Sequence, residues 1–216
     1  FLVPTVEARA PSKAKRAKIH HKKKTKKKKK KRRAKPKPKT TPRPPTTSTT
    51  TSSGGQLAVV TSCGNVSAIP SAVNSTGDQA VVLCLLNNER AKAGLIALRL
   101  DPQLTSASIS HSLDMVARQF FAHDAPGGSS PVSRMRAAGY IPASGAWQVG
   151  ENIAWGSGSY GSLGSIMQAW MNSPPHRENI LDPAFRDVGV GIAPGGPQGG
   201  PRLAAATYTT DFGKRG

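Results

Sequence analysis

Three polar side chains in the C-terminal part of the chain have the residue types of a cation site. His123 follows an aromatic pair at a predicted helix end, Glu151 precedes an apolar run, and His176 follows a double proline. Two imidazoles and one carboxylate, if the fold brings them together, form a divalent-cation site with an open position. Their spacing does not establish that they converge, and each one taken alone is typical of a capping or surface residue.

Other familiar catalytic patterns are absent from the sequence. The chain has no Gly-x-Ser-x-Gly elbow, no His-Glu-x-x-His helix and no phosphate-binding glycine loop. Its two cysteines, Cys63 and Cys84, lack the Cys-x-x-Cys spacing of a zinc site. In an oxidising compartment we expect them to form a disulfide that stabilises the fold by about 3 kcal/mol. The alternative is a pair of unpaired thiols.

The formal charge of +20 belongs to the N-terminal quarter, because 20 of the 31 basic residues and one of the 11 acidic residues precede residue 56. Lysine dominates residues 13–39 and a Pro/Thr-rich stretch follows, so we expect residues 1–55 to be a disordered tail and linker. Such a tail binds anionic polymers, a membrane or envelope surface or, non-specifically, nucleic acid. A solubilising spacer is the alternative. A dedicated nucleic-acid role is disfavoured because no aromatic side chains interleave the lysines.

The first ten residues carry a signal of export. Ala8-Arg9-Ala10 has the small-x-small pattern that precedes signal-peptidase cleavage, and Phe1-Leu2-Val3 fits the end of an apolar signal region. The alternative is an arbitrary chain boundary. No stretch reaches the roughly 18 apolar residues that span a bilayer. We therefore expect a secreted, extracellular protein that associates with the envelope.

The nearly neutral remainder, residues 56–216, is long enough to form one domain with its own core. Apolar spacing and the caps Asp101-Pro102 and Ser130-Pro131 predict helices that end at a glycine or at the double proline. These helices are expected over 78–93, 101–120, 130–138 and 163–172. Alternating apolar residues at 188–192, a Gly/Pro loop and the composition of 203–212 predict a hairpin at the end. Helices followed by a hairpin indicate an α+β fold.

Several motifs, taken together and in order, resemble the CAP superfamily of cysteine-rich secretory, antigen-five and pathogenesis-related proteins. The similarity extends over about residues 78–213 and is greatest to the bacterial, SCP-like secreted branch. The motifs are Asn87-Asn88-Glu89-Arg90, Phe121-Ala122-His123, Gly150-Glu151-Asn152-Ile153-Ala154, Trp170 to Leu181, Val188-Gly189-Val190-Gly191 and Tyr208 to Gly213.

The resemblance implies a three-layer α-β-α sandwich over 78–216. From the two cysteines we expect a segment, 56–77, to precede it and to be stapled to its first helix by the disulfide. It also implies a central cleft lined by two His and two Glu, in which the His pair can hold zinc or another divalent cation. His123, Glu151 and His176 match three of these positions, and Ser173 stands in the cleft where animal members have the second Glu. We expect Asn152 and Arg177 to hold loops in shape, and His111 to be structural.

Three functions compete at this point. The first is a monomeric, extracellular binding protein whose cleft takes a divalent cation and a lipid or cell-envelope ligand, with the basic tail as a tether. The second is a metal-assisted hydrolase, peptidase-like, with Glu151 as general base on a water bound by His123 and His176. The third is a non-specific polyanion binder that acts through the lysine run.

Overall fold

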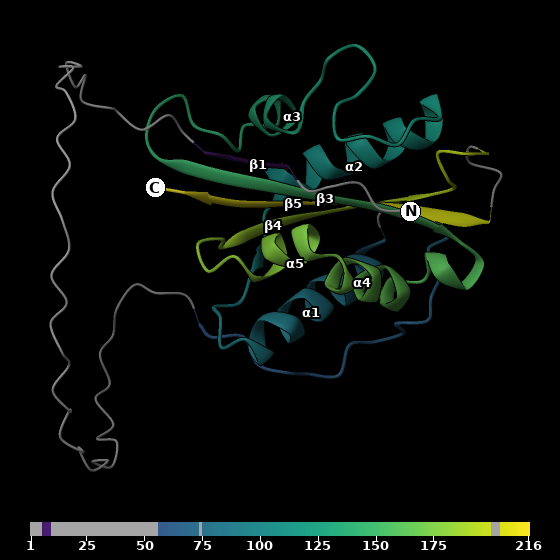
Figure 1. Ribbon diagram of the computed structural model, residues 1–216, viewed down its shortest axis with the longest axis horizontal. Helices are drawn as coiled ribbons and strands as arrows, with labels where there is room; N and C mark the ends of the chain where they lie inside the picture. The colour runs from purple at the N-terminus through teal and green to yellow at the C-terminus, as the bar shows by residue number, and fades with distance from the viewer. Residues whose placement is uncertain (1–5, 10–55, 74, 200–203) are drawn as a thin grey trace, which may run out of the picture. The chain divides into compact units, whose positions relative to one another are not determined.

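The computed structural model describes residues 6–9, 56–73, 75–199 and 204–216 (Figure 1). The expected disorder of the tail, and the lysine-rich stretch 13–39, lie outside the described residues. Within the span expected to be tail, residues Val6–Arg9 form a short strand, β1. This strand belongs to the same compact unit as residues 55–216.

The strands of the described residues form one sheet in the order β1-β3-β5-β4-β2. The last strand, β5, lies at its centre and pairs antiparallel with β3 on one side and β4 on the other. The short β2 pairs parallel with β4 at one edge, and β1 pairs antiparallel with β3 at the opposite edge. Their bounds are β2 Arg99–Leu100, β3 Trp147–Ser157, β4 Asp187–Pro194 and β5 Ala205–Arg215.

Helices cover both faces of this sheet, as Figure 1 shows. One face carries α2 and α3, and the other carries α1, α4 and α5. The bounds are α1 Thr76–Lys92, α2 Pro102–Arg118, α3 Pro131–Ala137, α4 Leu163–Asn172 and α5 Pro174–Leu181, with a 3₁₀ turn, η1, at Gly158–Gly161. The expected three-layer sandwich is confirmed. None of the helices described is both long enough and apolar enough to cross a membrane.

The predicted starts of α2 and α3 are confirmed by their caps. The Asp101 carboxylate accepts from the backbone N–H of Gln103 and of Leu104 at 2.9 and 3.0 Å, and Pro102 takes the first helical position of α2. Ser130 caps α3 in the same way, accepting from the N–H of Ser133. Each cap satisfies donors that have no partner inside the helix.

The two faces of the sheet bury separate apolar clusters. On the side of α1, α4 and α5, Trp170 packs edge-on against Tyr208, and Phe185 stacks on Phe212. On the side of α2 and α3, the smaller cluster contains Leu104, Met135, Tyr140 and Val149. The alternation of side chains along β3 therefore contributes to both cores, with Ala154 in one and Val149 in the other.

Helix α2 lies unusually close to β4 because of two glycines. A Cβ at Gly189 would lie 2.1 Å from the backbone carbon of Leu104, and one at Gly191 would lie 2.1 Å from that of Ser108. The glycines that alternate with apolar residues in β4 thus make room for the helix backbone itself. The contact lets Ser112 Oγ donate to Thr209 Oγ1 across the layer at 2.8 Å.

Two elements differ from the expectation from sequence. The double proline does end α4, but it also opens α5, because proline suits the first turn of a helix. The segment around Glu151 is the long strand β3, which its polar residues Glu151 and Asn152 had concealed. These side chains find partners on the helices, so they interrupt the apolar pattern without interrupting the strand.

The predicted disulfide between Cys63 and Cys84 is present, with the two Cα atoms 5.6 Å apart. It ties the segment before α1 to the middle of that helix. Next to it, Asn88 of α1 donates to the carbonyl of Thr61 at 2.7 Å and accepts from the N–H of Thr61 at 2.8 Å. The segment is therefore held by a covalent and a polar contact at the same place.

The glycine contact yields a stability prediction. Gly191→Ala should lower the free energy of unfolding of the full chain by about 2–3 kcal/mol, because the methyl group must displace the backbone of α2. Gly77→Ala is the matched control: it lies in the first turn of α1 with nothing within 4 Å of the added Cβ, and should change stability by less than about 1 kcal/mol. Urea unfolding measures both, and equal midpoints would contradict the close packing.

Candidate functional site

Glu151 is the centre of a buried polar cluster on the α2/α3 side of the sheet. Its carboxylate is fully buried, and each oxygen has its own partner. His123 Nδ1, from the loop after α2, lies 2.7 Å from Oε1, and Arg134 Nη2, from α3, donates to Oε2 at 2.7 Å. The structure thus brings two of the three predicted residues, His123 and Glu151, into direct contact.

Arg134 also anchors the loop that carries His123. Its Nη1 donates to the carbonyl of Ser129 at 2.9 Å, just before the start of α3. The guanidinium therefore links the carboxylate on β3 to the end of the loop formed by residues 119–130. Sequence reasoning missed this residue, because nothing in a seven-residue helix with two arginines marks which of them is buried.

Asp211 stands directly opposite Glu151 on the neighbouring strand β5. It is fully buried and accepts from Ser108 Oγ of α2 at 2.9 Å. Burial and the charge of Glu151 raise the pKa of Asp211 well above its usual range. Each of two carboxyls that share one buried space disfavours the charge of the other.

Glu151 is the member of the pair that stays ionised. Burial alone would raise the pKa of Glu151, but the hydrogen bond from His123 and the charge of Arg134 outweigh it and hold the pKa below the usual value. The site therefore contains one buried carboxylate, fixed by a guanidinium and an imidazole.

His111 of α2 belongs to this cluster. It is fully buried, and its Nε2 donates to the carbonyl of Ala122 at 3.0 Å and lies 4.0 Å from Glu151 Oε1. Burial lowers the pKa of His111 to about 4, so the ring is neutral at physiological pH. It supports the backbone immediately before His123. Its sequence signal was available: Ser108, His111 and Ser112 form a polar group on the otherwise apolar, buried face of α2.

His176 lies in α5, the helix that covers the same face of the sheet as α1 and α4. It is 1% exposed, and its Nδ1 lies 2.7 Å from Ser173 Oγ. Its backbone carbonyl accepts from Asn152 Nδ2 at 3.0 Å, which joins α5 to the residue next to Glu151. Ser173 is thus the partner that orients His176.

The Gly-Glu-Asn motif docks α5 onto β3. Asn179 Nδ2 donates to the carbonyl of Glu151 at 3.3 Å and to Asn152 Oδ1 at 3.2 Å. A Cβ at Gly150 would lie 2.7 Å from Asn179 Oδ1, so glycine is required there. Asn152 therefore holds helix α5 against β3, where a loop had been expected. Arg177 donates to the carbonyl of Met171 at 3.3 Å.

The two imidazoles predicted as cation ligands are engaged in the same way. His123 and His176 each engage Nδ1 with a neighbouring side chain, which makes Nε2 the nitrogen that a metal ion would take. In the described part of the chain, no group of three or more His, Cys, Asp or Glu side chains is arranged to hold a metal. Any cation must therefore complete its coordination with water or with a bound ligand.

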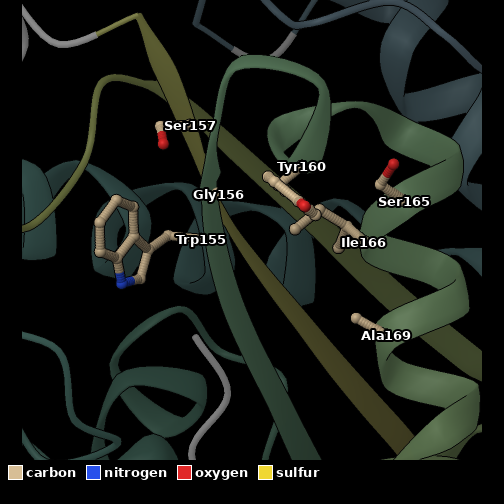
Figure 2. Close-up of a pocket in the computed structure, with 7 residues that line it drawn as sticks. All are labelled: Trp155, Gly156, Ser157, Tyr160, Ser165, Ile166 and Ala169. Carbon is tan, nitrogen blue, oxygen red and sulfur yellow. The ribbon is translucent and has the colours of Figure 1, made fainter.

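A hollow of about 240 Å³ lies at the far end of β3, between that strand and α4. Figure 2 shows Tyr160 between the strand and the helix residues Ile166 and Ala169. Tyr160 is 79% exposed and stands at the surface of this hollow. The hollow's lining is mainly apolar, unlike that of the Glu151 cluster.

The ring of His111 yields a pH prediction. Its pKa rises from about 4 in the native state to about 6.5 on unfolding, so the unfolded chain binds more protons between these values and stability falls as pH drops through them. When the pH is lowered from 7 to 4.5, the wild type should lose free energy of unfolding because of this ring. The His111→Gln chain lacks the ring, so its loss over the same pH range should be smaller by about 2–3 kcal/mol.

Urea unfolding at several pH values in the presence of EDTA measures this difference. His20→Gln/His21→Gln, which alters histidines of the predicted tail, is the control and should keep the wild-type dependence. An unchanged slope in His111→Gln would show that this ring is not buried in its neutral form.

Comparison with curated proteins identifies two relatives in Bacillus subtilis. The uncharacterized protein YkwD is 34% identical over 139 residues, which is 64% of this chain and 51% of YkwD. The uncharacterized membrane protein YlbC is 30% identical over 117 residues, or 54% of this chain and 32% of YlbC. The chain thus spans about half the length of one relative and about a third of the other.

Two solved structures share the fold. An extracellular protein from Bacillus anthracis that contains an SCP domain is 29% identical, with a TM-score of 0.50, over 63% of this chain and 40% of that one. An outer surface protein from Borrelia burgdorferi is 19% identical, with a TM-score of 0.55, over 66% and 96%. The sequence profile of the cysteine-rich secretory protein family matches residues 83–210, which is more than half of the 216 residues. The chain therefore belongs to the CAP, or cysteine-rich secretory protein, family.

Proposed function

We propose that this CAP-domain protein is a secreted binding protein whose site is built on the His123–Glu151 pair and accepts a divalent cation together with an external ligand. The observation that carries the proposal is the 2.7 Å contact between His123 Nδ1 and the buried carboxylate of Glu151. A carboxylate at this nitrogen fixes the ring's tautomer and its orientation. The Nε2 of His123 is thereby prepared to accept a cation.

The ion pair with Arg134 supports binding over hydrolysis. A general base must reach a water molecule with a free lone pair and a pKa near the working pH. Glu151 is fully buried, both its oxygens are engaged, and its pKa lies below the usual range. Its role in our proposal is to position His123. A metal-assisted hydrolase remains the second candidate and would need a base from outside the Glu151 cluster.

Location outside the cell is supported by two independent features. The Cys63–Cys84 disulfide is typical of proteins that fold in oxidising compartments. The Bacillus anthracis protein that shares the fold is extracellular, and its sequence is 29% identical to this chain in the aligned part. We further propose that the lysine-rich residues 13–39 hold the domain near anionic polymers or an anionic envelope surface, with nucleic acid bound only non-specifically.

Zinc titration by calorimetry tests the cation site. The full chain with His20→Ala/His21→Ala serves as background, which removes the tail imidazoles. In that background His123→Ala should weaken zinc binding at least tenfold, because it removes the oriented Nε2 ligand. His176→Ala should weaken it by a similar factor if both rings share the ion.

The control for this titration is Arg177→Ala, which alters a neighbour of His176 that contacts only a backbone carbonyl among the contacts described. It should leave zinc affinity within about twofold. Equal zinc affinity in the background, His123→Ala and His176→Ala chains would refute the cation site.

A further inference from the structure

The segment before α1, residues 56–73, carries most of the large apolar side chains that are exposed in the described part of the chain. Nine such side chains are exposed among the described residues, and six of them lie in this segment. They are Leu57, Val59, Val60, Val66, Ile69 and Val73, with exposed fractions between 37% and 64%. The same segment contains no Lys, Arg, Asp, Glu or His. A concentration of exposed apolar side chains of this kind marks a site of contact with a protein or a membrane.

The backbone of this segment is held along the outer side of α1. The N–H of Ala58 donates to the carbonyl of Leu95 at 2.9 Å, just after the helix ends, and the disulfide to α1 holds the middle of the segment. Farther on, the carbonyl of Val66 accepts from the N–H of Gly164 at 2.8 Å, at the start of α4. Figure 1 shows the segment passing outside α1, on the side away from the sheet. The apolar side chains are thus displayed on a backbone that is fixed to the domain.

The composition of the segment favours a lipid surface over a protein partner. Protein interfaces derive most of their affinity from aromatic side chains, Met and Arg that are buried in pockets of the partner. Residues 56–73 contain none of these, and the exposed apolar side chains are four Val, one Leu and one Ile. Scattered aliphatic side chains suit a fluid bilayer, because lipid chains adapt their shape to them.

The charge of the chain indicates which kind of lipid this surface meets. Residues 1–55 hold 20 basic residues and one acidic residue, and residues 40–55 separate the lysine-rich stretch from the segment. Membrane binding by a peripheral protein grows with its buried apolar area and with its electrostatic attraction to anionic lipids. The sequence supplies both contributions within its first 73 residues.

We propose that residues 56–73 form a membrane-contact surface, whose exposed apolar side chains enter the headgroup region of an anionic lipid bilayer. This inference rests on the tether proposed for the tail, and it names the anionic surface as a bilayer. The lysine-rich stretch supplies an attraction that salt screens. The apolar side chains supply a contact that does not depend on charge. The two contributions can therefore be measured separately.

Cosedimentation of the full chain with vesicles of phosphatidylcholine and phosphatidylglycerol, in a ratio of about 2:1, measures the association. Val59→Ser/Val60→Ser should weaken binding at least fivefold, and should remove the binding that persists in about 0.5 M NaCl. These two side chains are 64% and 63% exposed, so the fold does not depend on them. Leu113→Ser is the control: it alters a 40% exposed side chain of α2, on the other face of the sheet, and should leave binding within about twofold.

Two tryptophan reporters, matched to each other, test insertion directly. Brominated acyl chains quench the fluorescence of a Trp side chain that contacts them, so vesicles that contain brominated phosphatidylcholine show which residue enters the bilayer. The fluorescence of Val60→Trp should be quenched more than that of the wild type. Leu113→Trp should be quenched no more than the wild type. EDTA in the buffer keeps both measurements independent of the cation site.

Binding that high salt abolishes, with Val60→Trp quenched no more than the wild type, would overturn the inference and leave the attraction of the tail intact. No binding to the vesicles at low salt would overturn the insertion together with the tail's attraction to lipid. Sedimentation equilibrium without vesicles tests the other occupant, a second copy of the chain. An oligomer that Val59→Ser/Val60→Ser converts to a monomer would make the segment an interface between copies and would also refute the inference.

Discussion

The approach of helix α2 to strand β4 at backbone distance is the constraint on which the site depends. Gly189 and Gly191 allow it, and any side chain there would hold the two layers apart. The short separation brings Ser108 within hydrogen-bonding distance of Asp211 and seals the pair Asp211–Glu151 from water. In that dry space the pKa of Asp211 is raised and that of Glu151 is lowered, so the packing of a helix bears on the ionisation of the site.

A buried carboxylate is unfavourable unless its partners are well placed. Glu151 has partners from two separate elements, the loop after α2 and helix α3, and its backbone carbonyl is bound by a third, α5. The carboxylate of Glu151 therefore fixes the positions of the loop after α2 and of helix α3 against β3. His123, a residue of a loop, takes its orientation from this arrangement.

The local features of the fold could be predicted from the sequence. The contacts between residues that are distant in the sequence could not. The caps at Asp101 and Ser130 depend on neighbouring residues, and the apolar face of α4 repeats along one helix, so both were recognisable. β3 was not, because Glu151 and Asn152 break the alternation and their partners lie 17 to 28 residues away. Similarity to a known family pointed to His123, Glu151 and His176, and the match to the family is confirmed. Arg134 and Asp211 emerged only when the layers were assembled, since their importance lies in contacts between elements. The polar group around His111 on the buried face of α2 was visible in the sequence.

The order of the strands has a consequence for how the protein is made. β5 is the middle strand of the sheet and forms the longest pairings, yet it is the last strand to leave the ribosome. Until it emerges, β3 and β4 have no common partner, and their helices have no complete surface on which to pack. Contacts between distant parts of a chain form late and slowly. The central strand of the sheet is thus the last of its strands to become available, and the sheet of this domain cannot close before it does.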